Sequence, residues 1–207
     1  IAKIAKFLSN IGFNCQVLEF QGSTAKIQNL YAKYGTADKN ICFAGHTDVV
    51  PAGDAEWSFP PFEGRIENGM VGGRGAVDMK GGIASFLVAI EKFIAKQPNP
   101  NFAISVLISG NEEGDAVGGT PKILQWLKEQ NEKIDFCLMA EPSSINQIGD
   151  AYKLGRRGSV NFILKASGVQ GHIAEQKNPD NVIAKLAKLS ADLYDIELDK
   201  GNEFFEP

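Results

Sequence analysis

Four stretches of the sequence carry residue types that could bind a metal ion. His46 follows the apolar run ICFAG, Glu112 and Glu113 follow ISVLISGN, and Glu141 follows FCLMA, while Asp78 lies in the glycine-rich stretch GRGAVDMKGG. One imidazole and several carboxylates are a donor set that zinc uses in proteins. In an open α/β sheet, groups that follow strands meet beyond the carboxyl ends of the strands. The sequence therefore predicts a metal site at which His46, Asp78, Glu113 and Glu141, each expected to close a strand, converge.

Neighbouring residues could supply the rest of the chemistry. Asp48 lies two positions beyond His46 on the same face of an extended chain, so it could accept the proton of the second ring nitrogen and fix the tautomer. Asp78 is a short carboxylate in a turn where glycine lets the backbone approach a metal, which suits a bridge between two metals. Adjacent glutamates point in different directions, so Glu113 is predicted to bind metal and Glu112 to act as the general base.

Each of these features has an ordinary explanation when it is taken alone. A single histidine after a strand is more often a hydrogen-bonded structural residue than a ligand, and an acidic pair in a loop is more often a solvated turn. The segment EPSS could be only a helix cap, and GRGAVDMKGG could suggest a phosphate loop, although it lacks the G-K-[ST] ending. The joint occurrence of four metal-capable groups favours the metal site.

Strands and helices are predicted to alternate from residue 41 onward. Apolar runs too short for a helix indicate buried strands, and apolar residues at helical spacing indicate helices. The predicted strands lie within 41–50, 101–110 and 133–143, and the predicted helices within 81–97 and 120–131. Thr120 is expected as the N-cap of the second helix, with Pro121 at its first position. This order predicts an α/β fold with a mostly parallel sheet flanked by helices on both faces.

The sequence changes character after about Gly155. Residues 159–168 alternate in the manner of a strand, and residues 178–196 predict one long amphipathic helix. We therefore expect a larger domain over 1–157 and the start of a smaller α+β domain over 158–207. The chain begins inside a helical pattern without a methionine and ends without a stop signal, so both ends are expected to be cut.

Composition excludes several function classes. Hydrophobic residues make up 43% and charged residues 22%, which is typical of a soluble globular protein. A formal net charge of -4 does not favour nucleic acid as a partner, and no apolar stretch is long enough to predict a membrane span. Cys15, Cys42 and Cys137 form no C-x-x-C pair and are expected to be small buried side chains in a reducing cytoplasm.

Taken together, GHTDVVPAGD, GRGAVDMKGG, NEEGD and EPSS resemble the motifs of the co-catalytic zinc amidohydrolases of the aminoacylase and carboxypeptidase group. GDAYKLGRRGS, GVQGH and KGNEFF are similar to the members that hydrolyse N-succinyl-LL-2,6-diaminopimelate, and the similarity extends from residue 41 to Pro207. The resemblance implies a zinc-peptidase-like catalytic domain with a lid or dimerisation domain. It also implies a cytoplasmic homodimer that releases succinate and LL-2,6-diaminopimelate in lysine and diaminopimelate biosynthesis.

The resemblance further implies a metal role for four residues. Asp78 would bridge two zinc ions, His46 and Glu141 would complete one site, and Glu113 would serve the other, with cobalt possible in one of them. The last zinc ligand of the family is a histidine far downstream that has no counterpart within this chain. The second site is therefore expected to be incomplete as the sequence stands.

Catalytic and substrate-binding roles are implied in the same way. Glu112 would be the acid/base, with Asp48 behind the histidine ligand. Arg156 and Ser159 of GRRGS would hold a substrate carboxylate, and His172 would reach the active site of a partner subunit and polarise the scissile carbonyl. The plain alternatives are a solvated surface residue for Arg156 and a surface loop residue for His172. After QGHIA the family continues with an aromatic residue and a proline, whereas this chain reads EQKNPDN.

Two other functions stay open on the sequence. A related deacylase or dipeptidase, such as an acetylornithine deacetylase, would keep the metal ligands and lose the arginine motif. A non-catalytic dimerisation or binding fragment would be favoured if the protein ended at Pro207. Substrate profiling distinguishes the first alternative, and zinc stoichiometry and turnover distinguish the second.

Overall fold

The computed structural model describes residues 1–153, 155–156, 158, 160–172, 174 and 180–205 of the 207-residue chain. Ser159, one of the predicted substrate-binding residues, lies outside this set. The chain divides into two units, Ile1–Asp150 and Ala151–Pro207. We describe each unit separately.

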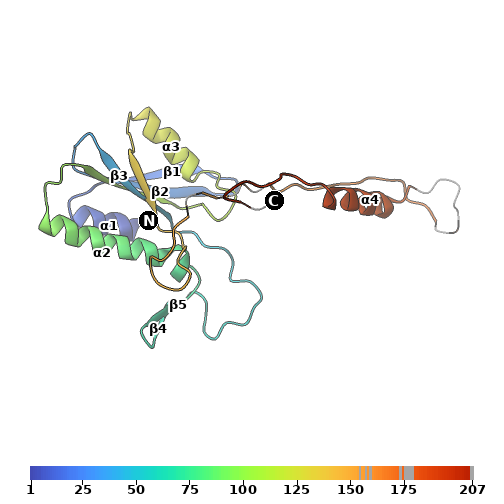
Figure 1. Ribbon diagram of the computed structural model, residues 1–207, viewed down its shortest axis with the longest axis horizontal. Helices are drawn as coiled ribbons and strands as arrows, with labels where there is room; N and C mark the ends of the chain where they lie inside the picture. Colours follow the sequence, from blue (N-terminus) through green and yellow to red (C-terminus); the bar gives the residue numbers. More distant parts are fainter. Residues whose placement is uncertain (154, 157, 159, 173, 175–179, 206–207) are drawn as a thin grey trace. The chain divides into compact units, whose positions relative to one another are not determined.

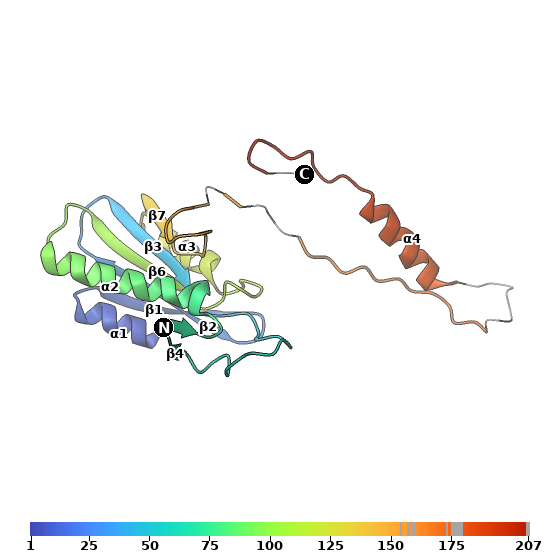
Figure 2. The same ribbon diagram turned by 60° about the horizontal axis from the view of Figure 1, so that its bottom comes forward.

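The first unit contains a five-stranded mixed sheet with the strand order β1-β2-β6-β3-β7 (Figures 1 and 2), whose strands are labelled in Figure 2. The strands are β1 (Asn14–Gln21), β2 (Lys26–Tyr34), β3 (Asn40–His46), β6 (Ala103–Ser109) and β7 (Phe136–Met139). β3 pairs in parallel with both β6 and β7, whereas β1–β2 and β2–β6 are antiparallel. The α/β class and the three strands predicted from residue 41 onward are confirmed. The antiparallel pairs involve β1 and β2 from the first 34 residues, a part of the chain for which no strand was predicted.

Helices cover both faces of this sheet, as predicted (Figures 1 and 2). They are α1 (Ala2–Asn10), α2 (Gly81–Lys96) and α3 (Thr120–Glu129). α1 and α2 share one face with Phe43, whose ring stacks on that of Phe86 at 4.1 Å between centroids. Cys42, the preceding residue of β3, lies in the other cluster with Leu127 of α3. This alternation follows from the two-residue period of a strand, and it explains why the buried run of β3 is continuously apolar.

α3 begins one residue earlier than predicted. Its N-cap is Gly119, and Thr120 is the first helical residue, without a side-chain capping bond. The expectation that Thr120 is the N-cap is therefore wrong. A Cβ atom at Gly119 would lie 2.2 Å from the carbonyl oxygen of Asn111, so the close passage of the chain requires glycine at the cap position.

A short hairpin follows the long loop after β3. It consists of β4 (Arg65–Glu67) and β5 (Met70–Gly72), which are antiparallel. The connecting residues Asn68 and Gly69 both have positive φ angles, 51° and 76°. An Asn-Gly pair in this conformation is the favoured two-residue hairpin turn, because its twist matches that of the strands. An irregular turn, η1 (Ala76–Lys80), then leads into α2.

The second unit contains α4 (Val182–Tyr194), which confirms the predicted helix. The side-chain oxygen of Asn181 caps it by accepting hydrogen bonds from the N–H groups of Ile183 and Ala184. Residues 160–168 form no strand, so that prediction is wrong for the part of it that the structure describes. Alternating side chains do not make a strand unless a neighbouring backbone accepts its hydrogen bonds. Among the described helices of the chain, none is long and apolar enough to cross a membrane.

Candidate metal centre

His46 is the last residue of the central strand β3 and is 1% exposed. It pairs with Ser109 of β6, so its imidazole lies at the carboxyl end of the parallel strands. The backbone N–H of His46 donates a hydrogen bond to Sδ of Met79 at 3.3 Å. Gly45 leaves room for this contact, because a Cβ atom there would lie 2.9 Å from the Met79 methyl carbon. Packing therefore holds the histidine in place before any ligand binds.

Asp78 lies in η1, the turn before α2, rather than at the end of a strand of the sheet. The expectation that it closes a strand is wrong. Asp78 and Met79 have non-helical backbone angles, and the peptide bond between them is cis. Gly75 begins the turn with a φ of 83°, which favours glycine. The turn brings Asp78 Oδ1 to 3.1 Å from Nε2 of His46.

Glu141 follows β7 and completes a group of three ligand-type side chains. Its Oε1 lies 3.5 Å from Nε2 of His46. One potential ligand atom from each of His46, Asp78 and Glu141 lies within 4.8 Å of the other two, and the described residues contain no other such group of three. One imidazole and two carboxylates match the three protein ligands of a catalytic zinc site, which keeps a fourth position open. The side chains present therefore fit a zinc ion.

Asp48 connects the histidine to the loop after β6. Nδ1 of His46 lies 3.1 Å from the main-chain carbonyl oxygen of Asp48 and 3.5 Å from its Oδ1. The other carboxylate oxygen, Oδ2, accepts hydrogen bonds from the backbone N–H groups of Glu112 and Glu113, both at 2.9 Å. The sequence predicted Asp48 behind the imidazole but gave no sign of the two amide contacts. Asp48 thus fixes both the ring nitrogen and the acidic loop.

The two glutamates occupy different positions around the histidine. Oε2 of Glu112 lies 3.9 Å from Nε2 of His46, and this side chain is 39% exposed. The pKa of Glu113 is raised, first by burial and then by the negative charge of Asp78, whereas His46 lowers it. Glu113 is not a member of the three-residue group. Its electrostatic coupling to Asp78 is consistent with a position beside that carboxylate.

The charge around His46 is strongly negative. Burial alone lowers the pKa of His46, but the hydrogen bond to the carbonyl of Asp48 and the negative charges of Asp48, Glu112 and Glu141 outweigh it. The net pKa is raised above the usual value of 6.5. Several carboxylates around one imidazole repel one another, and a bound cation relieves that repulsion.

Two predicted residues lie in the second unit. Arg156 and His172 are both exposed, and Nδ1 of His172 accepts a hydrogen bond from the N–H group of Ala174 at 3.2 Å. Their roles stay predictions, as does that of Ser159.

The loop between His46 and Asp78 contains a contact that sequence reasoning missed. The guanidinium of Arg74 lies over the ring of Trp57, 5.1 Å from its centroid. Both side chains donate hydrogen bonds to the carbonyl of Ala52, Nη2 of Arg74 at 3.3 Å and Nε1 of Trp57 at 3.2 Å. The Arg74–Trp57 pair thereby holds the loop that joins the two candidate ligands.

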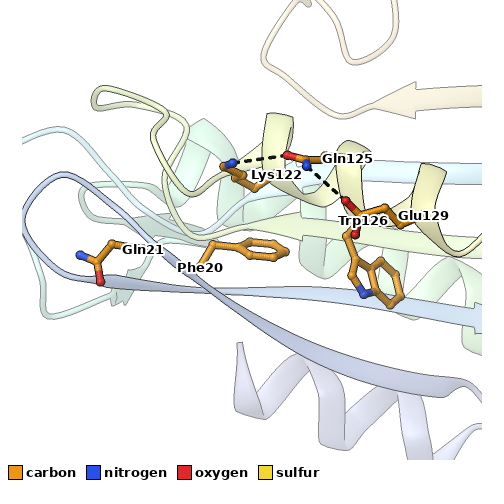
Figure 3. Close-up of a pocket in the computed structure, with 6 residues that line it drawn as sticks. All are labelled: Phe20, Gln21, Lys122, Gln125, Trp126 and Glu129. Carbon is orange, nitrogen blue, oxygen red and sulfur yellow. Dashed lines mark hydrogen bonds between the residues drawn. The ribbon is translucent and has the colours of Figure 1, made fainter.

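A pocket between β1 and α3 is separate from this centre (Figure 3). Its lining residues are Phe20, Gln21, Lys122, Gln125, Trp126 and Glu129. Lys122 donates a hydrogen bond to Gln125, which in turn donates one to Glu129. The polar side chains that line the pocket therefore bond to one another. None of the candidate ligands lines it.

The comparisons with known proteins agree with the geometry of the centre. Residues 42–204 match the model of peptidase family M20/M25/M40. The chain belongs to this family. Curated relatives include the succinyl-diaminopimelate desuccinylases of Ehrlichia canis, 49% identical over 210 residues, and Xanthobacter autotrophicus, 48% identical over 205 residues. Each alignment covers 99% of this chain and 54% of the relative, so the chain spans about half the length of these proteins.

Solved structures support the fold at lower sequence identity. Human carnosine dipeptidase 1 is similar with a TM-score of 0.62 and 24% identity, over 70% of this chain and 32% of that one. The M20 family metallo-carboxypeptidase Sso-CP2 from Sulfolobus solfataricus is similar with a TM-score of 0.55 and 23% identity, over 69% and 32%. These likenesses confirm the α/β fold of the family.

Proposed function

We propose that this chain provides the zinc-binding part of an amidohydrolase that cleaves N-succinyl-LL-2,6-diaminopimelate to succinate and LL-2,6-diaminopimelate, in lysine and diaminopimelate biosynthesis. The convergence of His46, Asp78 and Glu141 carries this proposal. It occurs in a chain that is nearly half identical, over almost its whole length, to proteins named succinyl-diaminopimelate desuccinylase. The donor set supports the metal, and the similarity supports the substrate.

His46, Asp78 and Glu141 would hold one zinc ion, and Asp78 with Glu113 would hold a second, with cobalt possible in one of the two sites. When bound, zinc lowers the pKa of water towards neutrality and polarises a carbonyl group. The distances within the three-residue group and the negative charge around the imidazole support the first site. The second has two ligands from this chain, so we expect it to be weaker.

Glu112 would act as the general base. It would take the proton of the attacking water and later return it to the leaving amine. Its carboxylate is partly exposed and lies 3.9 Å from Nε2 of His46, which suits a group that touches water beside the ligands rather than a ligand itself. Asp48 would position both His46 and Glu112. Its main-chain carbonyl can accept the Nδ1 proton of His46 and leave the lone pair of Nε2 for the metal, and its carboxylate accepts a hydrogen bond from the N–H group of Glu112.

The second unit would supply substrate recognition. Arg156, with Ser159, would bind a carboxylate of this small-molecule substrate through charge-assisted hydrogen bonds. His172 would act across a homodimer and stabilise the negative charge that develops on the carbonyl oxygen. The exposed apolar side chains Ile183 and Leu189 of α4 are 75% and 42% exposed, which is consistent with a dimer contact in this unit. We place the protein in the cytoplasm, with neither nucleic acid nor a membrane as its partner.

The test uses protein of verified intact mass, loaded with zinc and supplied with N-succinyl-LL-2,6-diaminopimelate. Release of succinate is measured beside release of acetate from N-acetylornithine. We expect the succinyl substrate to be preferred, and His46→Ala to lose both bound zinc and turnover. Lys3→Ala, an exposed change on α1, serves as the control. Turnover that survives His46→Ala, or a preference for N-acetylornithine, would contradict the proposal.

A further inference from the structure

Cys42 of β3 and Cys137 of β7 are directly opposite each other on two neighbouring parallel strands. Neighbouring strands lie about 4.7–4.9 Å apart, and disulfides join residues whose Cα atoms are about 4.4–6.8 Å apart. Directly paired residues also point to the same face of a sheet. The backbone therefore already holds these two cysteines at a separation that a disulfide can span.

The two thiols differ in accessibility. Cys42 is buried in the cluster beneath α3, whereas Cys137 is exposed. The expectation that all three cysteines are buried is therefore wrong for Cys137, which is exposed on the last strand of the described sheet, and for Cys15, which is half-buried. The adjacent thiol of Cys42 lowers the pKa of Cys137 to about 7 through a hydrogen bond, although burial opposes this shift. Since the thiolate is the nucleophile, Cys137 is the sulfur of the pair that reacts first with an external oxidant.

The third thiol provides an internal comparison. Cys15 lies in β1, at the opposite edge of the sheet order from β7. It packs with the cluster beneath α1 and α2, on the other face from Cys42. Its Sγ donates a hydrogen bond to the carbonyl of Ala5 at 3.4 Å. Cys15 therefore has neither the partner nor the exposure of Cys137.

We propose that Cys42 and Cys137 form an oxidisable pair that peroxide converts to an intramolecular disulfide. The Cys137 thiolate attacks one peroxide oxygen, the O–O bond breaks, the other oxygen leaves as hydroxide, and Cys137 becomes a sulfenic acid. The sulfur of Cys42 then attacks the Cys137 sulfur and forms the S–S bond, and the sulfenic oxygen leaves as water with the proton of the Cys42 thiol. Two thiols lose two electrons and two protons, and one peroxide becomes two water molecules.

A metal site is a weaker explanation of the same pair. The described residues contain one group of three ligand-type side chains, and neither cysteine belongs to it. Two thiolates alone provide half of the four ligands of a structural zinc site. The disulfide also has a defined place in the fold, since Cys42 and Cys137 each lie four residues before a candidate ligand, His46 and Glu141 respectively.

The test treats the reduced 207-residue chain with hydrogen peroxide, then denatures it, alkylates free thiols and digests it without reductant. Mass spectrometry should find a peptide that links Cys42 to Cys137 within one chain, two fewer alkylated thiols, and Cys15 still alkylated. A dithiol reductant should restore all three. Cys15→Ser, the matched control, should form the same link.

Two variants on different strands are used, so that the test still stands if one of the substitutions prevents folding. Cys137→Ser removes an exposed thiol, Cys42→Ala removes the buried one, and circular dichroism reports whether each stays folded. Neither should form an internal link. The proposal is overturned if Cys42 and Cys137 stay alkylatable after peroxide, if Cys137 links to Cys15, or if the link joins two chains.

Discussion

The two units of the chain differ in how their described residues are packed. Ile1–Asp150 has a core on each face of its sheet, and its buried side chains include His46. In Ala151–Pro207 none of the described residues is buried, including every residue of α4. The candidate metal ligands all lie in the first unit, whereas Arg156 and His172 lie in the second.

This difference separates the residues whose positions follow from packing in the core from those whose roles rest on similarity to relatives. A buried ligand has a fixed rotamer, so its distances to neighbours follow from the fold. An exposed side chain on a segment without a core has no such constraint. The contrast can be tested by comparing substitutions in each unit.

Glu112→Gln should reduce turnover by about 10²–10⁴-fold, because the amide keeps the size of the side chain but cannot accept a proton. Zinc content should be nearly unchanged, since Glu112 is outside the group of three ligand-type residues. Steady-state kinetics and elemental analysis of one preparation measure both. Glu129→Gln on α3 is the matched control. Full activity of Glu112→Gln would show that another group is the base.

Phe43→Ala should lower the free energy of unfolding by about 3–5 kcal/mol, because it leaves a cavity between β3 and α2. Ile183→Ala on α4 removes a side chain that is 75% exposed and should change it by less than about 0.5 kcal/mol. Denaturant unfolding of both variants measures the difference. An Ile183 effect as large as that of Phe43 would mean that α4 is packed in solution, and the contrast between the units would fail.

Apolar periodicity predicted most of the regular elements. β3, β6 and α2 contribute buried residues to the core, as the patterns indicate. β7 and α4 also form as predicted, although none of their residues is buried. The strand expected within 159–168 does not form in the described residues 160–168, because alternation predicts a half-buried face but supplies no partner strand. The antiparallel strands β1 and β2 lie before residue 41, in a part of the chain for which no strand was predicted, although polar and apolar residues alternate over Asn14–Val17. β1 pairs with β2, and β2 pairs with β6.

The candidate site was predicted in its residue types and only partly in its contacts. His46 and Glu141 follow strands, so their convergence could be expected from the parallel pairing of β3 and β7. The position of Asp78 depends on an irregular turn, and no simple period describes such a turn. The amide contacts of Asp48 join segments about sixty residues apart, a separation that spacing along the chain cannot reveal.

Asp48→Asn should weaken zinc binding or activity by about 10–100-fold, the usual effect of changing a residue that orients a metal ligand. The amide is a poorer acceptor for the N–H groups of Glu112 and Glu113, so the loop also loosens. Competition with a chromogenic chelator measures the affinity. Asp54→Asn, an exposed change in the same long loop, is the control. Wild-type affinity in Asp48→Asn would show that the Asp48 carboxylate does not position the site and that only its main-chain carbonyl does.

Zinc affinity should fall as the pH drops through the raised pKa of His46, by up to about tenfold per pH unit, because a proton and the metal compete for the imidazole. The stability of the metal-free protein should change in the opposite direction and fall as the pH rises. A folded pKa raised above 6.5 adds stability that is complete below that value and is lost as the pH rises through the folded pKa. Calorimetric titrations and unfolding curves across this range measure both. Affinity independent of pH would exclude His46 as a ligand.

Asn181→Ala should have the smallest effect, about 1 kcal/mol on α4 alone, because it removes the oxygen that accepts hydrogen bonds from Ile183 and Ala184. α4 buries no side chain among the described residues, and a helix of 13 residues is marginal without packing. The loss should therefore appear as faster hydrogen exchange within Val182–Tyr194, while exchange in β3 and β6 stays unchanged. Asn181→Ser keeps a capping oxygen and should restore the protection. If Asn181→Ala also lowered the unfolding midpoint of the first unit, the two units would be energetically coupled, and α4 would contribute to the stability of the sheet that positions His46.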